Sequence, residues 1–166
     1  MDIQVAVEKA ADMEDELYQH INIQEWNRFT AEKNIPPEFS TRIEVLLNVT
    51  KVIGGHVVNI GKLIIGHIID FIRENPNLAF GVAIGAVLGV LVNSIPFIGP
   101  IIAPIVTVVA VMVGGAFGAY LDKAARGQST QGSLLGSLIE GAIEAAKKTL
   151  KLLIEIFSAI NNYIAA

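Results

Sequence analysis

Polar residues that recur at regular spacing are the best candidates for chemistry in this chain. Asn48–Val58 and Asn59–Ile69 form an eleven-residue repeat, in which Lys51 corresponds to Lys62 and, in the start of a third copy, to Arg73. Eleven residues make about three turns of helix, so equivalent side chains would stack along one side. We therefore predict a polar seam of four residues on one helix: Lys51, Asn59, Lys62 and Arg73. In a ring of subunits the seam would line an aqueous lumen, whereas on a helix at a membrane surface it would face solvent.

The histidines do not indicate a metal centre. His56 and His67 hold equivalent positions in the repeat, which would put them about 16 Å apart on one helix, too far to share an ion. The chain has no cysteine and therefore no thiolate nucleophile. It also lacks a His-Glu-x-x-His sequence and a glycine-rich phosphate loop after a strand. We predict a protein that is not an enzyme, with no catalytic residue, resident metal or cofactor.

A long uncharged stretch dominates the middle of the sequence. Leu78–Leu121 covers 44 residues without a charged side chain, which is too long for one membrane crossing and about right for two. Two prolines and a glycine within Asn93–Pro100 interrupt a helix near its centre. We expect a helical hairpin with arms from Leu78 to about Val92 and from Ile101 to Leu121. The second arm has the roughly 20 residues that a crossing needs, and the first reaches this length only if the turn dips into the membrane.

Small residues recur every three or four positions in both arms, as in a glycine zipper. Such residues let helix backbones approach closely, and close contact is a main source of attraction between helices in lipid. One interpretation is that the stripes pack the hairpin on itself, and the other is that one stripe binds a second copy of the chain. The candidate helix-packing and oligomerisation residues are Gly81, Gly85, Gly89, Ala110, Gly114 and Gly118.

The segments around the hairpin are predicted to be amphipathic helices. Residues 38–75, with the repeat, and residues 128–166 gather their polar side chains on a narrow stripe and are apolar elsewhere. A helix packed on a globular core usually has a narrower apolar stripe, so this proportion favours lipid or protein contacts on several sides. Residues 1–36 are acidic and are expected to form a short helical cap. The predicted fold class is all-α: a membrane-inserted hairpin of two uncharged helices (78–121), flanked by long amphipathic helices and a short acidic N-terminal helical cap.

Charge placement predicts the orientation and excludes one class of partner. The net charge is −4, and lysine and arginine form no dense cluster, so we expect no nucleic-acid partner. Basic residues lie on both sides of the hairpin and none lies in its turn. The positive-inside bias therefore predicts that both termini lie on the cytoplasmic side of a membrane, and we expect a cytoplasmic membrane. The acidic N-terminus lacks a basic segment followed by an apolar core, so we expect no cleavable signal peptide.

The layout of amphipathic helices around an uncharged hairpin resembles two kinds of protein. It resembles the pore-forming colicin domains, which stay soluble until they insert. It also resembles small membrane-curving proteins, in which amphipathic helices flank two membrane helices. Neither resemblance extends to residue motifs, so no functional residues are transferred from either.

These observations favour a membrane protein that self-assembles into an oligomeric pore and permeabilises the bilayer. Its expected partners are the lipid bilayer and further copies of the chain, and the N-terminal cap stays open as a docking site for another protein. One alternative is a scaffold that curves a bilayer without conducting, and another is an accessory subunit of a larger membrane complex. A bundle with the hairpin as its core is disfavoured, because we expect the hairpin to be too small to cover the apolar arcs of the flanking helices.

Overall fold

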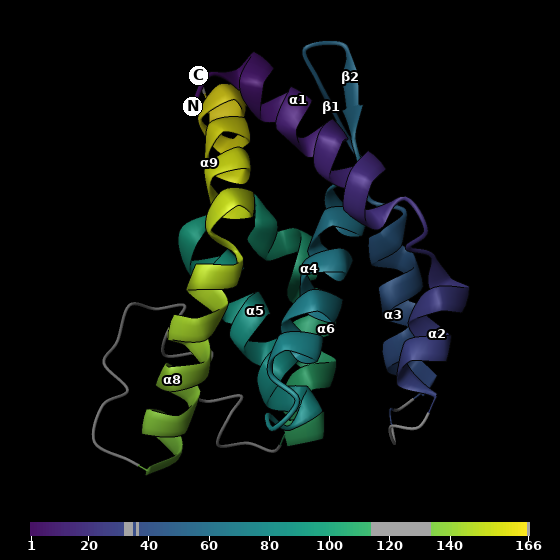
Figure 1. Cartoon of the computed structure of the whole chain (residues 1–166), viewed down its shortest axis with the longest axis vertical. Helices are drawn as coiled ribbons and strands as arrows, with labels where there is room; N and C mark the ends of the chain where they lie inside the picture. Colours follow the sequence, from purple (N-terminus) through teal and green to yellow (C-terminus); the bar gives the residue numbers. More distant parts are fainter. Residues whose placement is uncertain (32–34, 36, 114–133, 166) are drawn as a thin grey trace. The chain divides into compact units, whose positions relative to one another are not determined.

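The computed structural model of this protein describes residues 1–31, 35, 37–113 and 134–165, with residues 110–113 and 134–139 described as helical backbone alone (Figure 1). The described residues belong to two compact units. The terminal unit comprises Met1–Gly66 and Glu155–Ala166, and the central unit comprises His67–Ile154. Helices make up 78% of the structure, which confirms the mostly helical fold class.

The terminal unit begins with the predicted acidic cap. The first helix of this unit is α1 (Ile3–Met13), and a π-helical turn (Glu14–Tyr18) continues it. Helices α2 (Ile23–Thr30) and α3 (Pro37–Leu47) follow in the chain. The side chain of Asn22 caps α2, because its Oδ1 accepts a hydrogen bond of 2.8 Å from the backbone N–H of Glu25. The buried indole of Trp26 on α2 lies 5.8 Å from the ring of Phe39 on α3, measured between ring centroids. This aromatic contact joins α2 to α3.

A β-hairpin follows α3. Strands β1 (Lys51–Ile53) and β2 (His56–Val58) pair antiparallel, with Val52 opposite Val57. The two turn residues, Gly54 and Gly55, have φ angles of +57° and +83°. Two successive positive φ angles define the tight turn that suits the right-handed twist of paired strands, and glycine adopts them without steric strain.

This hairpin corrects the prediction of one continuous amphipathic helix over residues 38–75. The segment consists of α3, the β-hairpin and α4 (Ile60–Glu74). Only the second copy of the eleven-residue repeat is helical, whereas most of the first copy forms the two strands. The physical reason is the pair Gly54-Gly55, which allows a two-residue turn and is a weak helix former.

The central unit contains the predicted hairpin of uncharged helices. Helix α5 (Phe80–Ser94) contacts α6 (Ile98–Val113), and the two are joined by Ile95–Phe97. Ile95 leaves the helical conformation with φ −130° and ψ 100°, as expected for a residue that precedes proline. Two helices joined by a short turn are therefore present where the hairpin is predicted, while the predicted end of the second arm at Leu121 lies outside the described residues. The second arm starts at Ile98, earlier than predicted, because Pro100 fits in the first turn of a helix, where its missing N–H has no helical partner.

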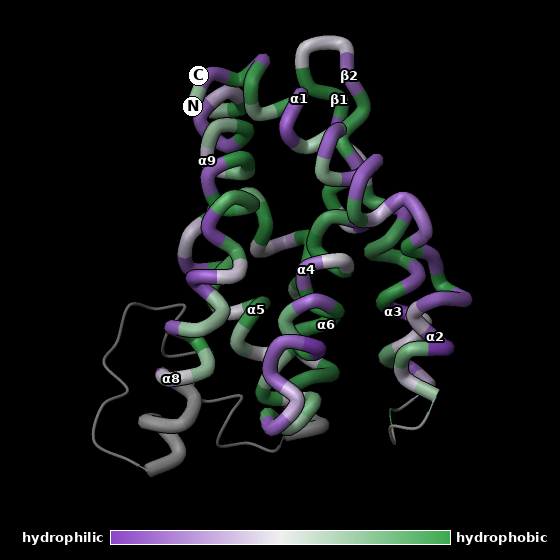
Figure 2. Tube along the Cα trace, in the orientation of Figure 1, coloured by the Kyte–Doolittle hydropathy of each residue, from purple (hydrophilic) through white to green (hydrophobic). Residues whose placement is uncertain are grey.

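Helix α5 is buried over most of its length. Every residue from Ala83 to Leu91 is buried, and this stretch of nine residues covers more than two turns, so all faces of the helix are covered. Within the central unit α5 also contacts α8 (Leu134–Thr149). Figure 2 shows α5 and α6 as mainly hydrophobic, whereas hydrophilic residues recur along α1 and α2.

The predicted C-terminal helix over residues 128–166 is two helices where the structure describes it. Helix α8 ends at Thr149, and α9 (Lys151–Ala165) begins after the buried Leu150. The backbone N–H of Leu150 still donates to Ala146 O at 2.9 Å, so the interruption is short. The predicted amphipathic character is present, because Leu153, Ile156 and Phe157 are fully buried while the last turn of α8 carries Lys147 and Lys148 on its exposed side.

Candidate functional site

The hairpin α5–α6 is the first candidate site because it has no charged side chain over its whole length. Most of the apolar residues of α5 are buried, whereas α6 has exposed apolar positions such as Ala103 and Pro104. Among the described residues, no helix combines the length and the hydropathy needed to cross a bilayer. That the hairpin is too small to cover the flanking helices stays a prediction, because burial alone does not show which segment covers a residue. On α4, every residue from Leu63 to Ile69 is buried.

The predicted glycine stripe lies on the buried helix α5. Gly81, Gly85 and Gly89 are all buried, and α5 contacts both α6 and α8. None of the three is therefore on an exposed face that a second copy could reach in this conformation. Ala110 belongs to the helical backbone of α6, while Gly114 and Gly118 lie outside the described residues. A role in oligomerisation stays a prediction for all six residues.

The predicted polar seam is only partly assembled. Asn59, just before α4, donates from Nδ2 to Glu14 Oε1 at 2.6 Å, and Lys62 Nζ lies 3.8 Å from the same oxygen. Lys62 also donates to the backbone oxygen of Gln19 at 3.1 Å. The side chains of Glu14 and Lys62 are 20% and 21% exposed, so water screens their attraction less than that of a surface pair. Two predicted residues thus meet on a partner from the acidic cap.

The remaining two seam residues are Lys51 and Arg73, and the position of Lys51 corrects the prediction of a single stripe. Lys51 belongs to strand β1, and Arg73 lies in the last turn of α4, within the central unit. The four residues do not share a helix face because Lys51 lies on a strand, whereas Lys62 and Arg73 keep the eleven-residue spacing on α4. No continuous polar stripe is formed over residues 51–73.

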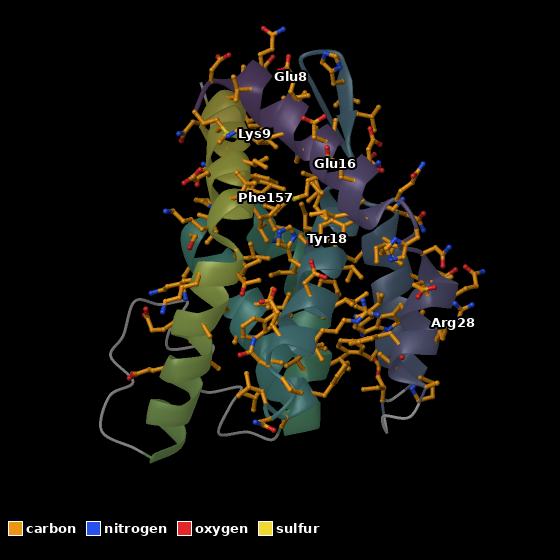
Figure 3. The ribbon with its side chains drawn as sticks, in the orientation of Figure 1. Glu8, Lys9, Glu16, Tyr18, Arg28 and Phe157 are labelled. Carbon is orange, nitrogen blue, oxygen red and sulfur yellow. The ribbon has the colours of Figure 1, made fainter. Side chains whose placement is uncertain are left out.

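An aromatic contact lies next to this polar group. Tyr18, the last residue of the π-helical turn, is 3% exposed and is labelled in Figure 3. Its ring lies so close to Gly66 of α4 that an ideal Cβ on Gly66 would be 2.6 Å from Tyr18 Cγ. Such a separation is too short for a real contact, so only glycine fits at position 66 unless the ring moves.

The start of α4 is equally close to the end of α3. A Cβ on Gly61 would overlap the carbonyl oxygen of Leu46, and the Gly61 N–H donates to Val49 O at 3.1 Å. The two glycines of α4 in the terminal unit, Gly61 and Gly66, therefore both serve close approach to other segments. A polar cavity of about 290 Å³ lies alongside, with Glu44, Asn48, Asn59 and Lys62 in its lining.

The histidines occupy unlike environments and do not converge. His56 is exposed on strand β2, whereas His67 on α4 is buried, with 5% of its surface exposed. Within the described part of the chain, histidine and the carboxylates form no group of three or more that could hold a metal ion.

The contacting residues of the cap were not found from the sequence. Glu14, Tyr18 and Gln19 lie more than 40 positions before their partners, which are Asn59, Gly66 and Lys62 respectively. The one local signal was that Glu14 and Tyr18 are four residues apart, which puts them on the same side of a helix. No pattern in the sequence indicates which helix they contact.

Comparison of the chain with protein-family models, with curated proteins and with solved structures finds no match.

Proposed function

We propose that this chain is a non-enzymatic, membrane-permeabilising protein that stores its uncharged hairpin α5–α6 inside a helical bundle and inserts it into a lipid bilayer. The observation that carries the proposal is the burial of Ala83–Leu91 on all faces of α5, within a stretch that has no charge. A helix that is apolar all round belongs either in a protein core or in a membrane. Its side chains exchange one apolar environment for the other at little cost.

The backbone of the hairpin is also compatible with lipid. Most backbone hydrogen bonds of α5 and α6 are formed within each helix, as the hydrocarbon region requires, but Pro104 inside α6 has no N–H to donate. The arms have 15 and 16 described residues, or about 22 to 24 Å at about 1.5 Å per residue, against a hydrocarbon core of about 30 Å. We therefore propose that the turn Ile95–Phe97 enters the bilayer with the arms. Both termini then stay on one side, the cytoplasmic side, where the basic residues lie.

Helix α8 can take an interfacial position when α5 leaves it. Its buried face includes Ala142 and Ala146, and its last turn carries Lys147 and Lys148. A helix with an apolar face and lysines on the other side binds in the plane of a membrane, more tightly when the lipids are anionic. Burial of the exposed apolar face among acyl chains would offset the loss of its contact with α5.

The glycine stripe has a role after insertion under this proposal. Gly81, Gly85 and Gly89 are buried in the closed structure, so they become available to another chain only when α5 leaves its neighbours. In lipid, small residues at this spacing allow helices to associate closely. Association of several hairpins then forms the permeabilising oligomer.

Dye release from liposomes tests the proposal. Ser94, at the end of α5, is exposed in the structure, so Ser94→Lys leaves the buried core intact but puts a charge where the turn must enter the bilayer. A lysine at the centre of a bilayer costs about 2.5–3.5 kcal/mol, and less toward the far surface that arms of this length approach, so insertion and dye release should fall by up to roughly 100-fold. The same change at Thr50, which is exposed outside the hairpin, is the control and should release dye as the wild type does.

Two results would reject the proposal. The first is wild-type protein that binds vesicles at saturation and leaves their contents inside. The second is equal dye release by Ser94→Lys and Thr50→Lys. Vesicles that are tubulated in electron micrographs without losing dye would favour the scaffold alternative instead.

A further inference from the structure

We propose that the acidic cap is an autoinhibitory latch on the membrane-permeabilising function. The latch consists of Glu14, Tyr18 and Gln19 from the cap, and of Asn59, Lys62 and Gly66 from the start of α4. It holds the cap on α4 and keeps the chain closed, and its release permits insertion. This inference rests on the proposed function, and the experiments below separate the failure of one from the failure of the other.

The latch is more than a surface ion pair. Glu14 accepts from Asn59 at 2.6 Å and lies 3.8 Å from Lys62 Nζ, while Lys62 donates to Gln19 O at 3.1 Å. Glu14 and Tyr18 start and end the π-helical turn, so one short segment supplies both the carboxylate and the ring. π-Helical turns are rare and occur frequently at functional sites. The polar and the aromatic contacts are therefore coupled.

The contacts on α4 follow one side of the helix. Asn59, Lys62 and Gly66 are separated by three and four residues, which is the spacing of neighbours on a helical face. The adjacent residues Leu63, Ile64 and Ile65 are fully buried. Removing the cap would uncover Gly66, which the ring of Tyr18 covers, beside this apolar stretch, and an exposed apolar surface favours association with lipid.

The distribution of charge gives the cap a second means of inhibition. Residues 1–33 carry eight carboxylates and only three basic side chains, whereas residues 34–166 carry eight carboxylates and nine basic side chains. The net negative charge of the protein therefore lies entirely in the cap. An anionic membrane repels the cap and attracts the remainder, so such a surface favours separation of the two.

A reversible cross-link tests the latch directly. A Cβ on Gly66 lies 2.6 Å from Tyr18 Cγ. One further carbon–carbon bond of about 1.5 Å brings the Cβ–Cβ distance between positions 18 and 66 to at most about 4.1 Å, below the upper end of the roughly 3.5–4.5 Å found in disulfides. The double variant Tyr18→Cys/Gly66→Cys can form only this intramolecular bridge, because the wild-type chain has no cysteine.

The readout is carboxyfluorescein release from vesicles of phosphatidylcholine and phosphatidylglycerol. With the bridge oxidised, release should fall by about tenfold or more, because the open population is removed, and a reductant should restore it. Equal release by the oxidised and the reduced forms would overturn the latch. If circular dichroism shows that the reduced variant is unfolded, dye release is measured instead for single variants that keep the Tyr18–Gly66 contact.

The single variants are Glu14→Gln and Lys62→Met, and both should release dye faster than the wild type. The matched control for Glu14 is Glu16→Gln, which removes the same charge from an exposed position two residues away (Figure 3). The second control is Ile43→Val, which removes a buried methylene group in the same unit. This variant shows how much dye release results from a general loss of stability. Release that is no faster than in both controls would overturn the latch.

If every form binds vesicles and none releases dye, the proposed function fails, and hydrogen exchange decides the latch alone. Under the latch, Lys62→Met speeds amide exchange in residues 3–18 and 60–66 together, and the oxidised bridge slows exchange in both. Exchange in these segments that is unchanged by either modification would overturn the latch as well.

Discussion

Thr149 at the end of α8 donates a hydrogen bond from Oγ1 to the carboxylate of Glu74 at the end of α4, over 3.1 Å. Both residues belong to the central unit and are separated by 75 positions in the chain. The bond connects the C-terminal ends of α4 and α8. A charged acceptor makes such a bond stronger than one between neutral groups, although exposure to solvent weakens it.

Replacing Thr149 by valine should therefore lower the free energy of unfolding slightly, by about 0.5–1 kcal/mol. The substitution keeps the shape of the side chain and removes only the hydroxyl. Urea denaturation followed by circular dichroism measures the change. Thr41→Val is the control, because the Thr41 hydroxyl bonds only to Pro37 O on its own helix. A loss no larger than that of Thr41→Val would show that the bond to Glu74 contributes nothing to stability.

Alanine at Gly66 and at Gly141 should change stability in opposite directions. At Gly66 the new Cβ collides with the ring of Tyr18, and overpacking of this kind lowers stability by about 1–3 kcal/mol. At Gly141 on α8 a Cβ meets nothing within 4 Å, so the better helix propensity of alanine should raise stability by about 0.5–1 kcal/mol. Urea denaturation of the two variants checks the pair. Equal effects would mean that Tyr18 moves away without penalty.

Position 54 should accept asparagine but not valine. Gly54 has φ +57° with no atom near its absent Cβ, so backbone conformation alone decides which residue is tolerated. Asparagine adopts this conformation readily, and Asn-Gly is a favoured pair in such turns, so Gly54→Asn should unfold at the wild-type temperature or slightly above it. A β-branched residue is strained there, so Gly54→Val should lower stability by about 1–2 kcal/mol. Matching melting temperatures for both variants would contradict the turn assignment.

The oligomerisation prediction is tested by Gly85→Ala. In a bilayer the added methyl group separates packed helices, so chemical cross-linking of vesicle-bound protein should trap fewer oligomers than in the wild type. Gly99→Ala is the control, since a Cβ there meets nothing within 4 Å. Because Gly85 is buried in the closed structure, urea denaturation of both variants is needed to separate assembly from folding. Unchanged cross-linking would remove Gly85 from the oligomerisation face.

The helical hairpin was predictable because its signals are local. An uncharged run interrupted by Pro96 and Pro100 determines two helices and a turn without reference to the rest of the chain. The β-hairpin was missed although it has a local signal too. The eleven-residue repeat predicts helix throughout, whereas the glycine pair Gly54-Gly55 favours a tight turn.

The two copies of the repeat show how one residue changes the outcome. Val52, Ile53, Val57 and Val58 correspond to Leu63, Ile64, Ile68 and Ile69, all of them apolar. The decisive difference is Gly54, whose counterpart is Ile65. Isoleucine disfavours the positive φ that a two-residue turn needs, so the second copy continues as a helix.

The sequence by itself determined the uncharged hairpin, the acidic cap and the helical class, since each depends on composition or on spacing within a few turns. Only the tertiary structure decided that Glu14 meets Asn59 and Lys62, that Tyr18 lies on Gly66, and that the glycines of α5 are buried. These contacts join residues more than 40 positions apart or depend on which helices are neighbours. Hydrophobic burial is not directional, so an apolar pattern specifies that a surface is covered but does not specify what covers it.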